Sequence, residues 1–411
     1  MSYNLGVFED GFYSHLYPLS LTRPVFDLRC GMTSLLEKII RHYSDFTLHL
    51  FVRDYLAGLT KENHPHARVN QIPANSCLLI NGRFLFEGDL PRHEGEEMAW
   101  CNRGKIVAAR LSAKSLTSLT VDQGRLIMPD ILAGIPQHEI AGKFLEFPWD
   151  LVNNNSAEIK KDFDYLNLGG QILGKIYSNV TLLDEKNIHI AAGATIKPGV
   201  VLDAEDGPIF IDEGATVMAN ACLQGPLYVG KKSVIKMGAK IYEGTSIGTV
   251  CKIGGEVDAS IIHGFSNKQH EGFLGHAYLG EWVNLGADTN NSDLKNNYSS
   301  VKVHIDGKMV DSGSLFAGLF MGDHAKSGIN TMFNTGTVVG VMSNVFGAGY
   351  PAKFIPSFTW GGAESSETYA LDKALEVARR AMTRRKENLT PVQEAMLRHV
   401  FEMTRSERAV S

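Results

Sequence analysis

The sequence is poor in cysteine and has no paired cysteine motif. Its five cysteines, at positions 30, 77, 101, 222 and 251, include no CxxC pair. That usage argues against a disulfide framework or a zinc knuckle and fits a reducing cytoplasm. No apolar run reaches about 18 residues, so no membrane span is predicted. The first residues, MSYNLGVFEDGF, lack the order of a signal peptide. We therefore expect a cytoplasmic protein that does not act at a membrane.

The chain also lacks a strong excess of one charge. Forty Lys and Arg stand against 45 Asp and Glu, for a net charge of -5. We therefore expect no global attraction to nucleic acid, and any anionic ligand needs a local cluster of basic groups. A chain of 411 residues exceeds one ordinary core, which predicts two domains or a repeat array.

Residues 1–165 have the pattern of an α/β domain. YNLGVFED, FTLHLFV and NSCLLING are typical of strands, and GMTSLLEKIIRHY has apolar residues at helical spacing. Strand–helix–strand order favours a Rossmann-like, mostly parallel sheet. WDLVNNNSAEIKKDF, at 149–163, is expected to begin a polar crossover, and 166–188 is expected to be a linker.

A period of six residues governs 189–358. Aliphatic residues recur every sixth position, with one slip of three, as Ile190, Ile196, Leu202, Ile211, Val217, Leu223, Val229, Ile235, Ile241, Ile247 and Ile253. A period of six matches neither a plain strand nor a helix, but it is typical of the hexapeptide left-handed parallel β-helix. An irregular β-sandwich is the alternative, and eight successive residues at this spacing disfavour it. The predicted interior columns are Ile211–Val229–Ile247, Val217–Ile235–Ile253 and Leu223–Ile241–Ala259.

The rhythm breaks at 266–286, SNKQHEGFLGHAYLGEWVNLG, and resumes at 321–345. The tail, 359–411, is expected to be helical, because ETYALDKALEVARRAMTRRKE is amphipathic and TPVQ at 390–393 forms a capping box with proline at the first helical position. A perfect prism has no pocket, so the break at 266 predicts a site.

Acetyl transfer from a thioester to an amine needs a base, oxyanion donors and a groove for coenzyme A. His270 is the candidate base, Asn284 the candidate orienting group, and Lys268 and Lys302 candidate phosphate contacts. The alternative is that His270 is an ordinary solvated histidine.

The segment QHEGFLGHAYLGEWVNLGADT resembles the acetyltransferase domain of the bifunctional GlmU family, whose pattern is xxGHxTYLGDxxIGxxVNIGAGT. The resemblance implies an acetyl-CoA-dependent N-acetyltransferase in UDP-N-acetylglucosamine synthesis, acting on an amino-sugar phosphate such as glucosamine 1-phosphate, and a homotrimer. It places the catalytic histidine on His270 and the active-site asparagine on Asn284. NNYSSVK is similar to the family's NYDGxxK and implies roles for Asn297, Tyr298 and Lys302.

The chain departs from this family at the expected phosphate contacts. Phe273 replaces a tyrosine whose hydroxyl contacts the sugar phosphate, and Asp258 replaces a lysine. An acid at 258 would repel a sugar phosphate unless Lys268 or Lys240 compensates. Lys240 stands about where the family places an arginine. These departures leave open an acceptor other than glucosamine 1-phosphate.

LYPLSLTRPVFDLRCG is similar, more remotely, to the sugar-nucleotide pyrophosphorylase signature GxGTRLxPLTxxxPKPL. That resemblance implies sugar-1-phosphate nucleotidyl transfer with UTP and Mg²⁺, with candidate nucleotide contacts at Gly11, Arg23, Arg29 and Arg83. Asn153 or Asn154 would be a late metal ligand. In INGRFL, however, Arg83 stands where the metal-binding aspartate belongs. A domain that binds a sugar nucleotide without turnover is the alternative.

Two further alternatives stay open. The first is a hexapeptide zinc enzyme similar to γ-class carbonic anhydrase, drawing three imidazoles from His263, His270, His276, His304 and His324. The second is a non-catalytic sugar-nucleotide sensor, in which neither His270 nor Asn284 would be needed.

Overall fold

The N-terminal part contains a seven-stranded, mostly parallel sheet, as expected. The computed structural model describes residues 3–127 and 134–408. The strand order is β12-β8-β9-β6-β1-β4-β5. Only β9 runs antiparallel to its neighbours. The strands are Tyr3–Phe8 (β1), Phe46–Phe51 (β4), Arg68–Val69 (β5), Cys77–Asn81 (β6), Met98–Asn102 (β8), Lys105–Leu111 (β9) and Gln137–Glu139 (β12).

Short helices and strand pairs surround this sheet. The helix predicted from GMTSLLEKIIRHY is present, and the reciprocal capping box of Ser34 and Glu37 starts it. The helices are Leu35–Ile40 (α1), Asp54–Asn63 (α2) and Ala113–Leu116 (α3), and the short strands are Arg29–Cys30 (β2), Thr33–Ser34 (β3), Phe84–Phe86 (β7), Thr120–Asp122 (β10), Arg125–Ile127 (β11) and Gly142–Phe144 (β13). Leu5, Val7, Leu50 and Ile80 are fully buried in the core of this part.

The second part is a left-handed parallel β-helix built from three stacked sheets, which confirms the meaning of the six-residue period. The first sheet contains Lys175–Ile176 (β14), Thr195–Ile196 (β17), Thr216–Val217 (β20), Val234–Ile235 (β23), Lys252–Ile253 (β26) and Asn267–Lys268 (β29). The second contains Thr181–Leu183 (β15), Val201–Asp203 (β18), Cys222–Gln224 (β21), Lys240–Ile241 (β24), Glu256–Asp258 (β27) and Phe273–Gly275 (β30). The third contains Ile188–Ile190 (β16), Ile209–Ile211 (β19), Leu227–Val229 (β22), Thr245–Thr249 (β25), Ile261–Gly264 (β28), Tyr278–Glu281 (β31), Leu319–Met321 (β35), Thr337–Val339 (β38) and Phe354–Ile355 (β40).

Two of the three predicted interior columns are confirmed. Ile211 pairs with Val229 and Val229 with Ile247, and the column from Val217 to Ile253 has the same regular stacking. The third column is wrong at its end, because Ile241 pairs with Val257. Ala259 instead lies in a turn with φ +39°. The coil is therefore two residues shorter here than the strict repeat.

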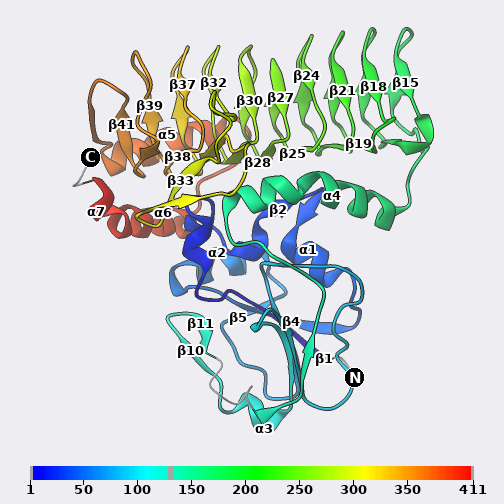
Figure 1. Ribbon diagram of the computed structural model, residues 1–411, viewed down its shortest axis with the longest axis vertical. Helices are drawn as coiled ribbons and strands as arrows, with labels where there is room; N and C mark the ends of the chain where they lie inside the picture. The colour runs from blue at the N-terminus through cyan, green and yellow to red at the C-terminus, as the bar shows by residue number, and fades with distance from the viewer. Residues whose placement is uncertain (1–2, 128–133, 409–411) are drawn as a thin grey trace.

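The polar segment 149–163, expected to begin the crossover out of the N-terminal part, lies within a long helix, Pro148–Leu166 (α4). Figure 1 shows α4 running beneath the row of coils, between the solenoid and the N-terminal sheet. Asn155 on α4 is fully buried; its amide oxygen accepts from Gly31 N at 2.6 Å and its Nδ2 donates to Gly244 O at 2.7 Å. The helix thus joins both parts of the chain.

The solenoid begins earlier than the sequence indicated. β14 and β15 lie inside 166–188, the expected linker, and pair with β17 and β18. At the other end, Thr359–Gly361 (β41) and Ser366–Thr368 (β42) continue a four-stranded sheet with Lys326–Ser327 (β36) and Asn344–Val345 (β39). Strand structure therefore extends into the expected helical tail.

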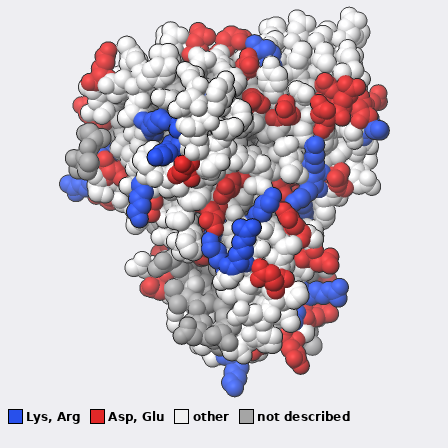
Figure 2. Space-filling model, in the orientation of Figure 1, with Lys and Arg blue, Asp and Glu red and all other residues white. Residues whose placement is uncertain are grey.

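The C-terminal helices fold back onto the N-terminal part. They are Leu371–Thr383 (α5), Pro391–Met403 (α6) and Arg405–Arg408 (α7), and α6 starts with the predicted capping box. The rings of Tyr55 on α2 and His399 on α6 stack at 4.5 Å. Within the described residues, no helix is both long and apolar enough to cross a membrane. On the face shown in Figure 2, acidic and basic side chains are interspersed.

Candidate functional site

His270 lies on an exposed turn between two faces of the solenoid. It follows β29 and precedes β30, and its side chain makes no hydrogen bond or ion pair with the described part of the chain. Gly272 shapes the turn, with φ +113° and a position at which a Cβ would meet Thr289 O at 2.2 Å. The turn therefore needs glycine and holds His270 at the surface.

Lys240 and Phe273 lie near this turn. The Lys240 Nζ is 3.9 Å from carboxylate oxygens of both Glu256 and Glu271, the residue after His270. Phe273 opens β30 and pairs with Glu256 on the coil before it. The structure thus brings Lys240 and Phe273 to the neighbourhood that the resemblance implies.

The side chain of Lys268 lies inside the solenoid. It pairs with Ile253, so its side chain occupies an interior column of the prism, where it is 1% exposed. Its Nζ donates to Gly254 O at 2.9 Å and to His270 O at 3.1 Å. Burial, partly opposed by Glu271, lowers the pKa of Lys268 to about 8. The expectation of a phosphate contact at Lys268 has no support in this placement.

Asn284 lies on the next coil, paired with Asn267. Its Oδ1 accepts from Asn267 Nδ2 at 3.2 Å, and Asn267 Oδ1 in turn accepts from Arg385 Nη2 at 2.5 Å. No hydrogen bond joins His270 to Asn284 in the described residues. Asn284 is half-buried, and Asn267 connects it to Arg385, which follows α5.

Asn297, Tyr298 and Lys302 belong to an insertion that leaves the coil. Asn297 and Tyr298 are exposed, and Lys302 begins the hairpin of Lys302–Ile305 (β33) and Lys308–Asp311 (β34). The hairpin packs on the N-terminal part, where Ser14 Oγ donates to Asp306 Oδ2 at 3.0 Å. This segment connects the two parts of the protein.

Sequence reasoning missed a cluster of ligating side chains one turn beyond His270. Asp258, His276 and Asp293 place one donor atom each within 4.8 Å of one another. His276 Nδ1 lies 2.9 Å from Asp293 Oδ2. Asp258 and His276 had each drawn attention separately, but Asp293 had not. The 17-residue coil spacing from 276 to 293 was the available signal.

The five histidines of the zinc hypothesis do not converge. His324 is buried and His263 is half-buried, both near Arg23. Desolvation, with Arg23 adding to the effect, lowers the pKa of His263 well below its usual value. The ring of His304 stacks on Phe354 at 3.8 Å, in the hairpin. In the described chain, the one group of three metal-ligating side chains contains a single histidine.

Arg23 and Arg29 hold the two parts of the chain together. Arg23 Nη2 lies 2.7 Å from Asp323 Oδ2 and 3.3 Å from Glu281 Oε2, both on the solenoid. The Arg29 backbone N donates to the hydroxyl of Tyr278 on β31 at 2.9 Å. Since Arg23 is 5% exposed and already paired, it does not offer its charge to a nucleotide.

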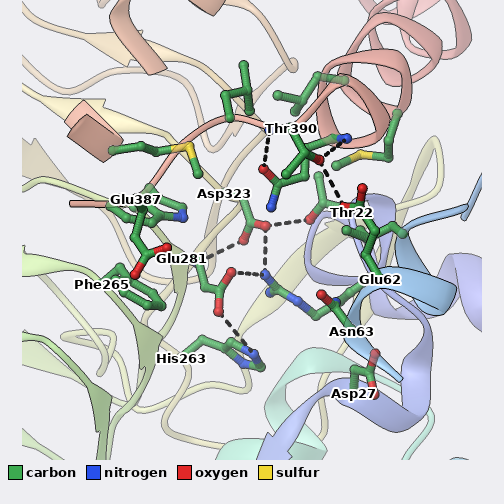
Figure 3. A pocket seen from close by; sticks show the side chains of 18 of the residues that line it. Thr22, Asp27, Glu62, Asn63, His263, Phe265, Glu281, Asp323, Glu387 and Thr390 are labelled. Atoms are coloured by element: carbon green, nitrogen blue, oxygen red, sulfur yellow. Dashed lines mark hydrogen bonds and ion pairs between the residues drawn. The ribbon is translucent and has the colours of Figure 1, made fainter. Parts of the chain in front are cut away.

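A cavity of about 870 Å³ lies at this junction. Its walls come from the N-terminal part, the solenoid and the C-terminal helices, and Figure 3 shows Asp323 and Glu281 between Thr22 and His263. Thr22 Oγ1 donates to Asp323 Oδ2 at 2.7 Å. Burial raises the pKa of Glu281, although Arg23 opposes the shift.

A second cavity, of about 450 Å³, has one of the sequence candidates, Asn154, in its wall. Arg103, Lys105, Lys143 and Asn154 are among its lining residues. Gly11 is exposed on the loop after β1, and Asn153 is exposed on α4. Glu146, Asp150 and Asp311 line the same cavity, and Lys105 pairs with Glu146, so its charge is mixed. Arg103, Lys105 and Lys143 were not among the sequence candidates.

Where the resemblance places Mg²⁺ ligands, the structure has a buried arginine and an asparagine that is already hydrogen-bonded. Arg83 is fully buried, and its Nη2 and Nε bond to Asp10 at 2.6 and 2.8 Å. Asn154 donates to Asp150 O at 2.8 Å, and its Oδ1 accepts from Lys143 at 3.4 Å. A guanidinium that already neutralises Asp10 takes the place of a cation, so these residues do not fit Mg²⁺.

Comparison with known proteins agrees with this two-part organisation. Residues 5–171 match the family described as sugar nucleotidyl transferase. The chain is 32% identical over 199 residues to a bifunctional sugar-1-phosphate nucleotidylyltransferase/acetyltransferase of Sulfurisphaera tokodaii, covering 48% of this chain and 43% of the relative. It is 34% identical over 189 residues to the bifunctional protein GlmU of Methanocaldococcus jannaschii, covering 46% and 43%.

The chain thus spans less than half the length of these curated relatives. Among solved structures, it is similar to a UDP-N-acetylglucosamine acyltransferase of Francisella novicida, with 13% identity, a TM-score of 0.31, and coverage of 57% of this chain and 78% of the other. The fold and the sequence matches define a sugar nucleotidyl transferase-like domain followed by a hexapeptide-repeat β-helix. The particular relatives that the chain resembles are the bifunctional nucleotidylyltransferase/acetyltransferases.

Proposed function

We propose that this protein is an acetyl-CoA-dependent N-acetyltransferase whose acceptor is an amino-sugar phosphate, such as glucosamine 1-phosphate. The observation that carries the proposal is the exposed turn at His270, where the imidazole bonds to no residue that the structure describes and Lys240 and Phe273 lie nearby. The similarity to relatives named acetyltransferases supports it. Synthesis of a UDP-N-acetylglucosamine type of product, a cytoplasmic location and a homotrimer belong to the same proposal.

His270 would accept the proton of the acceptor ammonium, so that the amine nitrogen can attack the thioester carbonyl carbon. The new C–N bond forms and the C–S bond breaks. Of the two protons that the nitrogen loses, one goes to the departing thiolate and the other is released to solvent. Asn284 would orient the acceptor, and Lys240 would meet its phosphate. Asn297, Tyr298 and Lys302 remain candidates for the rim of the acceptor or coenzyme A groove.

The test is thiol release from acetyl-CoA with glucosamine 1-phosphate. We expect His270→Ala to lower kcat by about 10²–10⁴-fold, the range for loss of a general base. His66→Ala, an exposed histidine in the N-terminal part, is the matched control and should retain full activity. Equal rates for His270→Ala and the wild type would reject His270 as the base. A folded wild type inactive with every amino-sugar phosphate would reject the function.

Nucleotidyl transfer is the second candidate function, favoured by the family match over 5–171. The Arg83–Asp10 pair favours instead a domain that binds a sugar nucleotide without turnover. Incubation with UTP and N-acetylglucosamine 1-phosphate, with pyrophosphate release as the readout, separates the two. Saturable UTP or UDP-sugar binding without pyrophosphate would assign the binding role.

A further inference from the structure

The cluster of Asp258, His276 and Asp293 is built by the solenoid itself. Asp258 ends β27, His276 follows β30, and Asp293 follows Asn290–Asn291 (β32), so each side chain comes from a successive coil. Asp258 pairs with Gly275, the residue before His276. Since neighbouring coils stack at about 4.8 Å, side chains at one corner converge without any loop having to close.

The packing around the cluster restricts its geometry. The ring of His276 stacks on Phe316 at 4.8 Å with an interplanar angle of 18°. The backbone N of His276 donates to Asp258 O at 3.1 Å. At Gly275, a Cβ would lie 2.4 Å from Asp293 Oδ2, so the carboxylate fills the space that a side chain would otherwise take. These donors are pre-positioned.

The charges in the cluster are incompletely compensated. Asp258 is half-buried, and its carboxylate accepts no hydrogen bond from any residue that the structure describes. Burial raises the pKa of Asp258; His276 opposes the shift, and Glu243 and Asp293 add to it. Two carboxylates in one partly buried site repel each other, which favours a cation between them. The imidazole makes this a mixed nitrogen and oxygen donor set rather than a cluster of acids.

We propose that Asp258, His276 and Asp293 bind one divalent transition-metal ion. Metal–donor distances of about 2.0–2.2 Å put donors of one coordination shell up to about 4.4 Å apart, so small side-chain rotations bring the three atoms into range. Binding through Nδ1 replaces the hydrogen bond to Asp293, and the neutral ring then carries its proton on Nε2. Imidazole with two carboxylates suits Mn²⁺ or Zn²⁺ better than Mg²⁺, which prefers oxygen donors alone.

The metal would give the proposed acetyltransferase its missing positive charge. This consequence rests on the proposed function. Asp258 stands where the resembling family has a lysine, and Phe273 replaces a tyrosine that contacts the sugar phosphate. Three protein ligands leave coordination positions open, and a phosphate oxygen of the acceptor fits one of them. Asp258 would then hold the phosphate indirectly, by binding the metal ion to which a phosphate oxygen is coordinated, instead of repelling it.

The direct test is titration of the untagged, EDTA-dialysed protein with Mn²⁺ and separately with Zn²⁺, by isothermal calorimetry in the absence of substrate. We expect one saturable site per chain for at least one of the two ions. Asp293→Asn and His276→Gln should each weaken it by at least tenfold. The controls are His270→Gln and Glu271→Gln, which change neighbouring exposed groups and should bind as the wild type does. Absence of saturable binding, or equal binding by all variants, would overturn the proposal.

Folding of each variant is checked by far-UV circular dichroism without metal. If His276→Gln does not fold, Asp258→Asn replaces it, because the Asp258 carboxylate has no hydrogen-bond partner to lose among the described residues. The acetyl-transfer assay is run separately. Turnover by a wild type that binds neither ion defeats the metal site alone, whereas specific metal binding without turnover on any amino sugar defeats the acetyltransferase alone. If both hold, metal should lower KM for glucosamine 1-phosphate and leave KM for glucosamine unchanged.

Discussion

Lys268 makes the stability of the solenoid depend on pH in a direction that can be calculated. Its ammonium lies inside the prism, and burial lowers its pKa to about 8, against about 10.4 in an unfolded chain. Each unit of difference is worth about 1.4 kcal/mol, so the buried charge costs about 3 kcal/mol. The cost is fully present below pH 8. It disappears as the pH rises from about 8 to about 10.4, because the unfolded chain then binds the extra proton.

The perturbation is Lys268→Met, which keeps an unbranched side chain of similar length without the charge. The variant leaves Gly254 O and His270 O without their donor, which costs about 1–3 kcal/mol per carbonyl at every pH. That constant loss lowers the variant's free energy of unfolding equally at every pH, so it does not change how that free energy varies with pH. Relative to the variant, the wild type should therefore gain up to about 3 kcal/mol between pH 8 and 10.4.

The assay is guanidinium unfolding of both proteins at pH 7, 8, 9 and 10, followed by far-UV circular dichroism. Subtraction of the two curves removes the titration of all shared groups. Lys231→Met, at an exposed lysine on the same solenoid, is the control and should run parallel to the wild type. If Lys268→Met also runs parallel to the wild type, Lys268 titrates normally and the reasoning from its burial is refuted.

Three other substitutions follow from buried contacts. Arg23→Met leaves Asp323 without its ion-pair partner in a buried site and should cost about 3–5 kcal/mol, seen as a lower transition temperature in calorimetry. Ile247→Ala, in a fully buried column, should cost about 2–5 kcal/mol in urea unfolding. Burial lowers the pKa of His64, but its hydrogen bond to Asp27 outweighs this and raises it. Asp27→Asn should therefore destabilise the protein more at pH 5.5, below the ordinary histidine pKa, than at pH 9, above the raised one, in thermal melts at both values.

The solenoid was predictable because the same contacts, between residues of neighbouring coils, repeat along the chain. An aliphatic residue every sixth position fills a narrow prism, and the column from Val217 to Ile253 follows directly from that spacing. The prediction failed at Ala259, where one coil loses two residues and Val257 takes the interior position. A shortened coil leaves no mark in composition, so only the strand register reveals it.

The candidate site was predictable only in part. His270 was identified from a resemblance, and its exposure on a glycine-dependent turn is compatible with that role. Lys268, two residues away, has a charged side chain of the kind usually found at the surface. It lies in the core instead, because the strand register pairs it with Ile253 in an interior column. Asp293 was missed because its partners are 17 and 35 positions away in the sequence.

The sequence by itself determined the elements that depend on near neighbours. These are the period-six coils, the helix α1, the capping box of α6 and a mostly parallel N-terminal sheet. Only the tertiary structure decided what the charged side chains do. Arg23 belongs to a motif typical of phosphate binding, yet it pairs with Asp323, 300 residues away. A side chain's burial and partners depend on contacts between distant segments, and charge can be neutralised by whichever opposite group the fold brings within reach.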